Sequence, residues 1–162
     1  MNKASKLLRI YLNDHLAGAV IGVEVAKRSQ KSNKGTPLGD FLAEFVAEAS
    51  ADKAQLGQIM DSVGASRSIL KSRAAWVAEK LGRLKLNGQL TGYSDLSRLT
   101  ELEGLVIGVT GKIGLWRSLQ EAFPPSQPPP VDLQWLLQRA QGQLVELERH
   151  YREAAAKAFG FG

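Results

Sequence analysis

The sequence predicts an all-α protein, a four-helix bundle in up-down-down-up order. Apolar residues recur at helical spacing in four long runs, 3–29, 37–63, 95–123 and 131–159. Short links join the first pair and the last pair of runs, whereas the long segment 64–94 joins the middle pair. Each run would be roughly 40 Å long at 1.5 Å per residue, so a short link can join only antiparallel neighbours. The long segment can return along the outside of the bundle, which makes the two middle helices parallel.

Length and composition are those of one soluble domain that spans residues 1–162. A chain of 17.6 kDa can bury most of its apolar surface, and its 44% hydrophobic and 23% charged residues are ordinary for a globular protein. The absence of cysteine excludes disulfides, thiolate catalysis and Cys-ligated zinc. No apolar run approaches the roughly 18 residues of a membrane span, and polar residues interrupt the N-terminal run. We therefore expect a cytoplasmic protein without membrane association.

The first run, 3–29, is apolar on two sides. One stripe follows helical spacing from Leu8 to Ala26. A second strip on the opposite side consists of Leu7, Ile10, Ala17, Ile21 and Val25. A helix with two apolar sides has to be covered twice, once by its own bundle and once by another surface. We therefore expect a homodimer through helix 3–29.

The boundaries of the other runs carry recognisable capping residues. Thr36 is a suitable N-cap, and Pro37 suits the first helical position. Gly64 is typical of a left-handed C-cap at the end of the second run. Ser94 or the residue after it starts the third run, and Asp132 favours the start of the fourth.

The long segment is predicted to contain an additional short helix, about 66–83, and to carry a basic patch. Residues 84–91 are ambiguous, because their Asn-Gly pair is typical both of a hairpin turn and of a helix end. The basic patch consists of Arg67, Lys71, Arg73, Lys80, Arg83 and Lys85. Such a patch could contact nucleic-acid phosphates or an acidic protein partner. A solvated basic face is the simpler interpretation.

Four polar residues at or beside core positions form the candidate site. Asp52 lies within the apolar stripe of the second run, with Glu48 one turn before it. His15 lies on the core stripe of the first run, and Glu103 borders the core of the third. Buried charges are costly unless they are paired or bind a metal. These four residues could ligate iron or another divalent metal. Alternatively, they could form a hydrogen-bonded structural cluster, in which His15 pairs with Asp52 or Glu48, or basic residues such as Lys112 or Arg117 take part.

Two further patterns are assigned structural roles. Glu146 and His150 stand four residues apart, but helical periodicity places them opposite Leu147 and Tyr151, which predicts a solvent-facing pair. Segment 107–114 (IGVTGKIG) departs from the phosphate-loop pattern and lies within a helical run. Its glycines are predicted to permit close helix packing.

The layout resembles the ferritin-like superfamily over essentially the whole chain. Stretches 11–18 (YLNDHLAG) and 82–88 (GRLKLNG) are similar to small bacterial ferritin-like four-helix-bundle proteins of unknown function, some of them stress-associated. The resemblance implies a carboxylate on each long helix for a di-metal centre. Three of these positions could be filled by Glu48 or Asp52, Glu103 and Glu148, whereas Glu24, the only Glu of the first run, is predicted to face outward. The chain lacks both Glu-x-x-His motifs of such centres, which argues against ferroxidase, oxygenase and iron-storage activity.

We therefore expect a non-enzymatic structural or interaction protein that has no standard di-iron site and needs no cofactor. Its stress association rests on the resemblance alone. An atypical metal-binding protein or metal-dependent oxidase that uses the four candidate residues is the alternative. A third hypothesis is association with nucleic acid through the basic patch.

Overall fold

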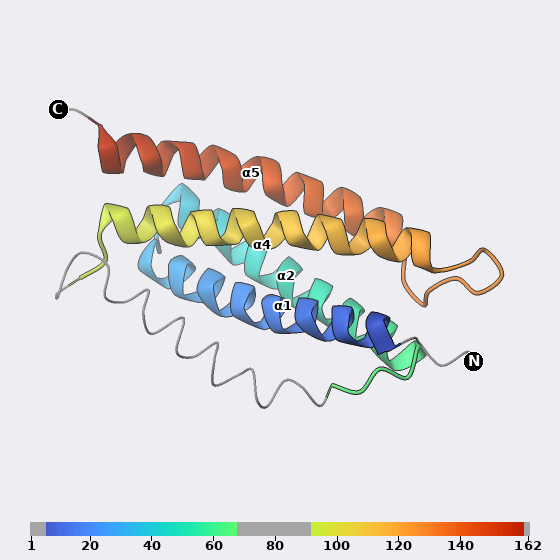
Figure 1. The fold of residues 1–162 in the computed structure, drawn as a ribbon. Coiled ribbons are helices and arrows are strands. Elements are labelled where there is room, and N and C mark those ends of the chain that lie inside the picture. The colour runs from blue at the N-terminus through green and yellow to red at the C-terminus, as the bar shows by residue number, and fades with distance from the viewer. Residues whose placement is uncertain (1–5, 68–91, 161–162) are drawn as a thin grey trace.

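The computed structural model describes residues 6–67 and 92–160, and within these ranges the chain forms four long α-helices (Figure 1). They are α1 (Lys6–Ser32), α2 (Pro37–Ser62), α4 (Asp95–Ala122) and α5 (Leu133–Phe159). Helices α1 and α2 form one antiparallel hairpin and α4 and α5 another, while α2 and α4 run in the same direction (Figure 1). The predicted four-helix bundle with a long crossover is confirmed. The additional crossover helix and the alternatives for 84–91 fall almost entirely outside the described residues.

The helix boundaries follow the capping residues of the sequence. The Thr36 hydroxyl accepts a hydrogen bond from the backbone N–H of Gly39 at 3.1 Å, as predicted for an N-cap. The Asp132 carboxylate likewise accepts from the backbone N–H of Trp135 at 2.9 Å. Gly64 has a φ of 64° just beyond the end of α2, the left-handed conformation that favours glycine. Local sequence therefore sets where these helices begin and end.

The core lies along the line on which all four helices converge. Its largest fully buried side chains include Leu12 of α1, Leu42 and Ile59 of α2, Trp116 of α4 and Leu147 of α5. Burying each such side chain stabilises the fold by about 1.5–3 kcal/mol, so packing between the helices supplies most of the driving force. None of the described helices has the length and apolar character that a membrane span needs.

The second apolar strip of α1 is covered mostly by the bundle itself. Ala17 and Val25 are buried and Ile21 is half-buried, because α1 packs against both α2 and α4. Leu7 and Ile10 remain 77% and 41% exposed. The two apolar sides of α1 therefore reflect two neighbours within the chain, and only its N-terminal end presents an uncovered apolar surface.

Gly39 marks a close approach between the start of α2 and the end of α1, and it provides a test of this packing. A Cβ at Gly39 would lie 2.1 Å from the carbonyl oxygen of Asn33. Gly39→Ala is therefore expected to lower the free energy of unfolding by about 1–3 kcal/mol, as overpacking does. A matched control is Gly142→Ala in α5, where the added Cβ meets no atom within 4 Å.

The control should raise the free energy of unfolding by about 0.5–1 kcal/mol, because alanine is the better helix residue. Urea unfolding followed by circular dichroism measures both variants. Effects of the same sign at the two glycines would contradict the close approach.

Candidate functional site

Asp52 of α2 lies at the centre of the bundle between two cations from other helices. Its side chain is buried, with 2% of the residue exposed. Lys112 Nζ of α4 donates a hydrogen bond to Asp52 Oδ2 at 2.5 Å, and the Arg139 guanidinium of α5 donates to Oδ1. Each carboxylate oxygen thus faces a positive charge, which is the condition under which a buried carboxylate is tolerated.

The contacts of Asp52 extend into a network that joins α2, α4 and α5. Lys112 Nζ also donates to Gln143 Oε1 at 2.5 Å, and Gln143 Nε2 donates to Glu48 Oε2 at 2.7 Å. The guanidinium of Arg139 lies 4.0 Å from the centroid of the Trp135 ring, a cation–π arrangement. We call this network the central cluster; its members are Glu48, Asp52, Lys112, Arg139 and Gln143.

Lys112 is the most perturbed base of the central cluster. Loss of hydration on burial lowers its pKa, and the charge and hydrogen bond of Asp52 oppose that effect. An ammonium group has three N–H donors, and its contacts with Asp52 and Gln143 use two of them. The third N–H has no hydrogen-bond acceptor among the described residues, and the ammonium lies 5.9 Å from the centroid of the Phe45 ring.

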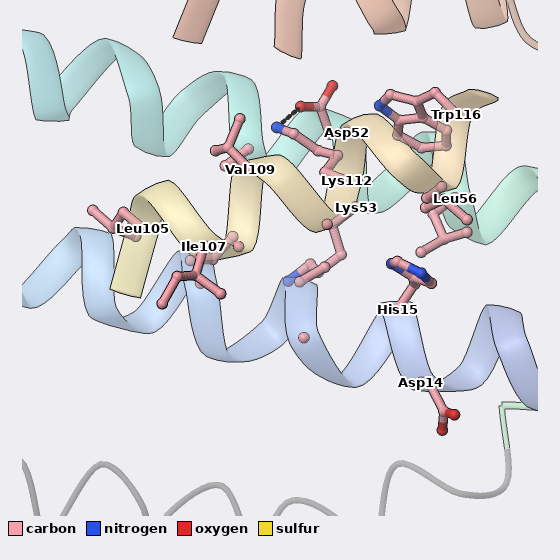
Figure 2. A pocket seen from close by; sticks show the side chains of 18 of the residues that line it. Asp14, His15, Asp52, Lys53, Leu56, Leu105, Ile107, Val109, Lys112 and Trp116 are labelled. Atoms are coloured by element: carbon pink, nitrogen blue, oxygen red, sulfur yellow. Dashed lines mark hydrogen bonds and ion pairs between the residues drawn. The ribbon is translucent and has the colours of Figure 1, made fainter. Parts of the chain in front are cut away.

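A cavity of about 310 Å³ adjoins the central cluster between α1, α2 and α4 (Figure 2). Asp52 and Lys112 line one part of it and His15 another, while most of the remaining lining is apolar or glycine. Its volume is at the lower end of the about 300–1,000 Å³ that is typical of small-molecule pockets. This cavity and the central cluster together form the candidate site.

His15 of α1 is half-buried on the wall of this cavity. Its imidazole packs edge-on against Tyr11, with 4.6 Å between the ring centroids. Loss of hydration lowers the pKa of His15, and the charge of Asp14 opposes this shift. At neutral pH the ring is therefore uncharged and offers one hydrogen-bond donor and one acceptor.

The glycines of segment 107–114 do not mediate close helix packing, so that prediction is wrong. A Cβ at Gly108, Gly111 or Gly114 would have no atom of a neighbouring element within 4 Å. Gly108 and Gly111 instead line the cavity. Glycine in a helix can mark either a tight contact or an open space, and here it marks open space.

The structure gathers only part of the predicted metal site. Glu48 and Asp52 belong to the central cluster and His15 faces the adjoining cavity, whereas Glu103 is exposed on α4. Within residues 6–67 and 92–160, no group of three or more His, Cys, Asp or Glu side chains could hold a metal ion. Because both oxygens of Asp52 already face cations, this donor set does not fit a metal centre.

Gln143 and Arg139 are the members of the central cluster that the sequence did not indicate, and Arg139 is the charged one. It stands three residues after Leu136, on the flank of the apolar stripe of α5, where an arginine usually extends its charged end into water. The one available signal was Asp52 itself, because a carboxylate in a core stripe requires a cationic partner. Lys112 was considered for that role, and the structure adds a second cation.

His150 was predicted to face solvent, and this prediction is wrong, because the residue is only 3% exposed. The buried side of α5 includes Gln143, His150 and Ala154, whereas Leu144 and Tyr151 are half-buried. The apolar residues alone therefore placed the seam of α5 one position too far along. The two polar residues Gln143 and His150 lie on the buried side of α5, so the positions of the apolar residues alone did not identify that side.

His150 is held as a neutral ring. It packs against Phe41 of α2 with 5.0 Å between the ring centroids. Arg149 Nη2 lies 3.0 Å from His150 Nε2, and because a guanidinium can only donate, Nε2 accepts. The ring proton is thus on Nδ1, 3.6 Å from Glu153 Oε2. Loss of hydration and the charge of Arg149 lower the pKa of His150, while Glu153 and Glu146 oppose the shift.

A second buried network lies where α1 ends and α4 begins. Glu101 Oε1 accepts from Arg28 Nε at 2.7 Å, and Glu101 Oε2 accepts from the Tyr93 hydroxyl at 2.9 Å. Asn33 Nδ2 also donates to the Tyr93 oxygen at 3.0 Å. Burial, together with the charge of Glu101, raises the pKa of Tyr93. These contacts tie the two hairpins together at one end of the bundle.

Of the predicted basic patch, Arg67 alone lies within the described residues. Its Nη2 donates to Asp61 Oδ2 at 2.7 Å and to the carbonyl oxygen of Gly57 at 3.2 Å. The other members are Lys71, Arg73, Lys80, Arg83 and Lys85, which lie outside these residues. Nucleic-acid binding through the patch therefore stays a prediction.

No protein-family model, curated protein or solved structure matches this chain. The bundle architecture agrees with the ferritin-like resemblance, but membership in that superfamily stays a prediction. A four-helix bundle hosts many unrelated functions, so function has to be argued from the central cluster and the cavity.

The lowered pKa values of His15 and His150 predict a pH-dependent stability. Between each lowered pKa and the ordinary value of 6.5, the unfolded chain binds more protons than the folded chain. The free energy of unfolding should therefore fall as the pH drops below 6.5, by at most about 1.4 kcal/mol per pH unit for each histidine.

Urea unfolding between about pH 5.5 and 7.5 measures this slope, since Asp and Glu titrate mostly below that range. His150→Gln cannot titrate and should flatten the slope, and His15→Gln is the matched variant on the other side of the core. A slope in His150→Gln that equals the wild-type slope would show that His150 is not held neutral.

Proposed function

We propose that this chain is a non-enzymatic helical bundle with a structural or interaction role, in which an ion-pair network occupies the place of a metal centre. The position of Asp52 between Lys112 and Arg139 supports this most directly. A metal ion at Asp52 would have to displace both cations from the carboxylate. The same observation disfavours the alternative of a metal-dependent oxidase.

The central cluster supports a structural role because its members come from three helices and are joined by ion pairs and hydrogen bonds. Removing one partner of a buried ion pair leaves an uncompensated charge in the interior, which typically costs about 3–5 kcal/mol. The cluster therefore makes the packing of α4 and α5 against α2 depend on one carboxylate. A stress-related role remains a proposal that rests on the ferritin-like resemblance.

Substitution of Asp52 separates the structural role from the metal-binding role. Asp52→Asn is expected to lower the free energy of unfolding by about 3–5 kcal/mol, because Lys112 and Arg139 lose their counter-charge. Glu103→Gln is the matched control on exposed surface and should stay within about 0.5 kcal/mol of wild type. Replacing all three charged residues by Leu and Met should recover most of the loss.

Metal analysis of the same proteins tests the functional proposal itself. Wild type purified without chelators should contain no stoichiometric metal, and added Fe²⁺, Mn²⁺ or Zn²⁺ should not raise its melting temperature. Stoichiometric metal that is lost in Asp52→Asn would overturn the proposal in favour of the metal-dependent alternative.

The interaction role concerns the apolar N-terminal end of α1, where Leu7 and Ile10 are 77% and 41% exposed. We expect a second copy of the chain to cover this surface. Light scattering should then give a mass near twice 17.6 kDa, and the double variant Leu7→Glu/Ile10→Glu should be monomeric. Val145→Glu is the control, because Val145 is 62% exposed on α5, away from this surface. A monomeric wild type at micromolar concentration would contradict the dimer.

A further inference from the structure

The walls of the cavity are set by the antiparallel register of α1 and α4. The two helices touch on either side of the cavity. The Tyr11 hydroxyl donates to Ser118 Oγ at 3.3 Å on one side, and Arg28 Nε donates to Glu101 Oε1 at 2.7 Å on the other. Between these contacts, the middle parts of α1 and α4 form opposite walls of the cavity.

Glycines occupy facing positions on these walls. The register places Gly18 opposite Gly111 and Gly22 opposite Ile107, next to Gly108, and all four glycines line the cavity. A Cβ at any of them would meet no atom of a neighbouring element within 4 Å. Each glycine destabilises its helix by about 0.5–1 kcal/mol relative to alanine, and no close packing offsets that cost. The glycines therefore keep this space open.

The body of the cavity suits an apolar molecule. Phe45, Ala49 and Leu56 of α2 line it together with Leu105 and Val109 of α4. Its volume of about 310 Å³ is roughly twice that of an engineered cavity of about 150 Å³, in another protein, that binds benzene. A compound with one or two rings therefore fits.

Two side chains that line the cavity, Trp116 and Lys112, each have one N–H without a hydrogen-bond acceptor in the part of the chain that the structure describes. Trp116 lines the cavity and is 1% exposed, and its indole Nε1 has no hydrogen-bond partner among the described residues. Lys112, one turn earlier on α4, has one N–H left over. Figure 2 shows the indole nitrogen on the side of the Trp116 ring nearest Asp52. An unpaired buried donor destabilises the protein, and an acceptor on a ligand would relieve that cost.

The charges around the cavity favour an uncharged ligand. In the central cluster, the positive charges of Lys112 and Arg139 are matched by the carboxylates of Asp52 and Glu48. Asp14 and Lys53 also line the cavity, and their opposite charges leave the charges around it balanced. A ligand with a net charge would disturb this balance in a partly apolar space, which is unfavourable. His15 on the opposite wall adds a polar contact without adding a charge.

From this geometry we propose that the cavity between α1, α2 and α4 binds a neutral compound of one or two rings that carries a hydrogen-bond-accepting oxygen. The ring body lies between the glycine-lined walls, and the oxygen accepts from Trp116 Nε1 and Lys112 Nζ. This site is a small-molecule site in addition to the structural role proposed above, and it requires neither a metal nor a second chain.

A matched pair of probes tests both parts of this assignment. 1-Acetylnaphthalene carries a carbonyl oxygen, and 1-ethylnaphthalene has nearly the same shape without an acceptor. Both should bind the wild-type protein, and the acetyl compound should bind about 5- to 100-fold more tightly, as expected for two net hydrogen bonds. The indole N–H resonance of Trp116, assigned with Trp116→Phe, should move downfield, as hydrogen bonding requires, only with the acetyl compound.

Glycine variants test where the probes bind. Gly22→Leu and Gly108→Leu place a side chain in the open space of the cavity and should weaken binding of both probes at least about tenfold. Gly104→Leu is the matched control, because its Cβ is equally unobstructed but Gly104 does not line the cavity. Melting temperatures verify that each variant is folded.

Failure of either probe to bind the wild type up to its solubility limit would overturn the site, as would unchanged binding in Gly22→Leu and Gly108→Leu. Equal affinities for the two probes, with no shift at Trp116, would overturn the assignment of an accepting oxygen. These outcomes are independent of the metal analysis, because neither the probes nor the glycine variants alter the ion pairs of Asp52.

Discussion

The neutralisation of Asp52 by Lys112 and Arg139 is the constraint on which the rest of this bundle depends. A shift of the α4–α5 hairpin along α2 would separate the Asp52 carboxylate from Lys112 and Arg139 and leave unpaired charges inside. The ion pairs therefore fix one relative position of the helices, and the second network around Glu101 fixes the same hairpins at the end of the bundle.

The helices and their caps could be read from the sequence because they depend on local chemistry. Thr36, Gly64 and Asp132 act on groups a few residues away, so their types and positions were sufficient. The seam of α5 could not be read in the same way. Its buried side includes Gln143 and His150, and a polar residue gives no hydrophobic signal even where tertiary partners hold it inside.

The same distinction between local and tertiary information applies to the candidate site. Asp52 could be singled out from the sequence, since a carboxylate in an apolar stripe is anomalous by itself. Its partner Arg139 is remote in the chain and has no local signature, so only the assembled bundle identifies it. The cavity could not be predicted from the sequence either, because a glycine within a helical run does not indicate whether it faces a neighbouring backbone or an open space. Pairing across helices and empty volume are properties of the assembly.

The glycine-lined walls also bear on how this fold can change. At Gly18, Gly22, Gly108 and Gly111, a new side chain can be added without displacing a neighbour. Most interior substitutions in a close-packed protein disturb the surrounding residues. Here Gly18, Gly108 and Gly111 are exposed where they line the cavity, so its size and shape can be altered one residue at a time while the ion pairs and the leucine core stay as they are. The seam between α1 and α4 is thus the part of the bundle that natural variation or engineering can remodel most freely.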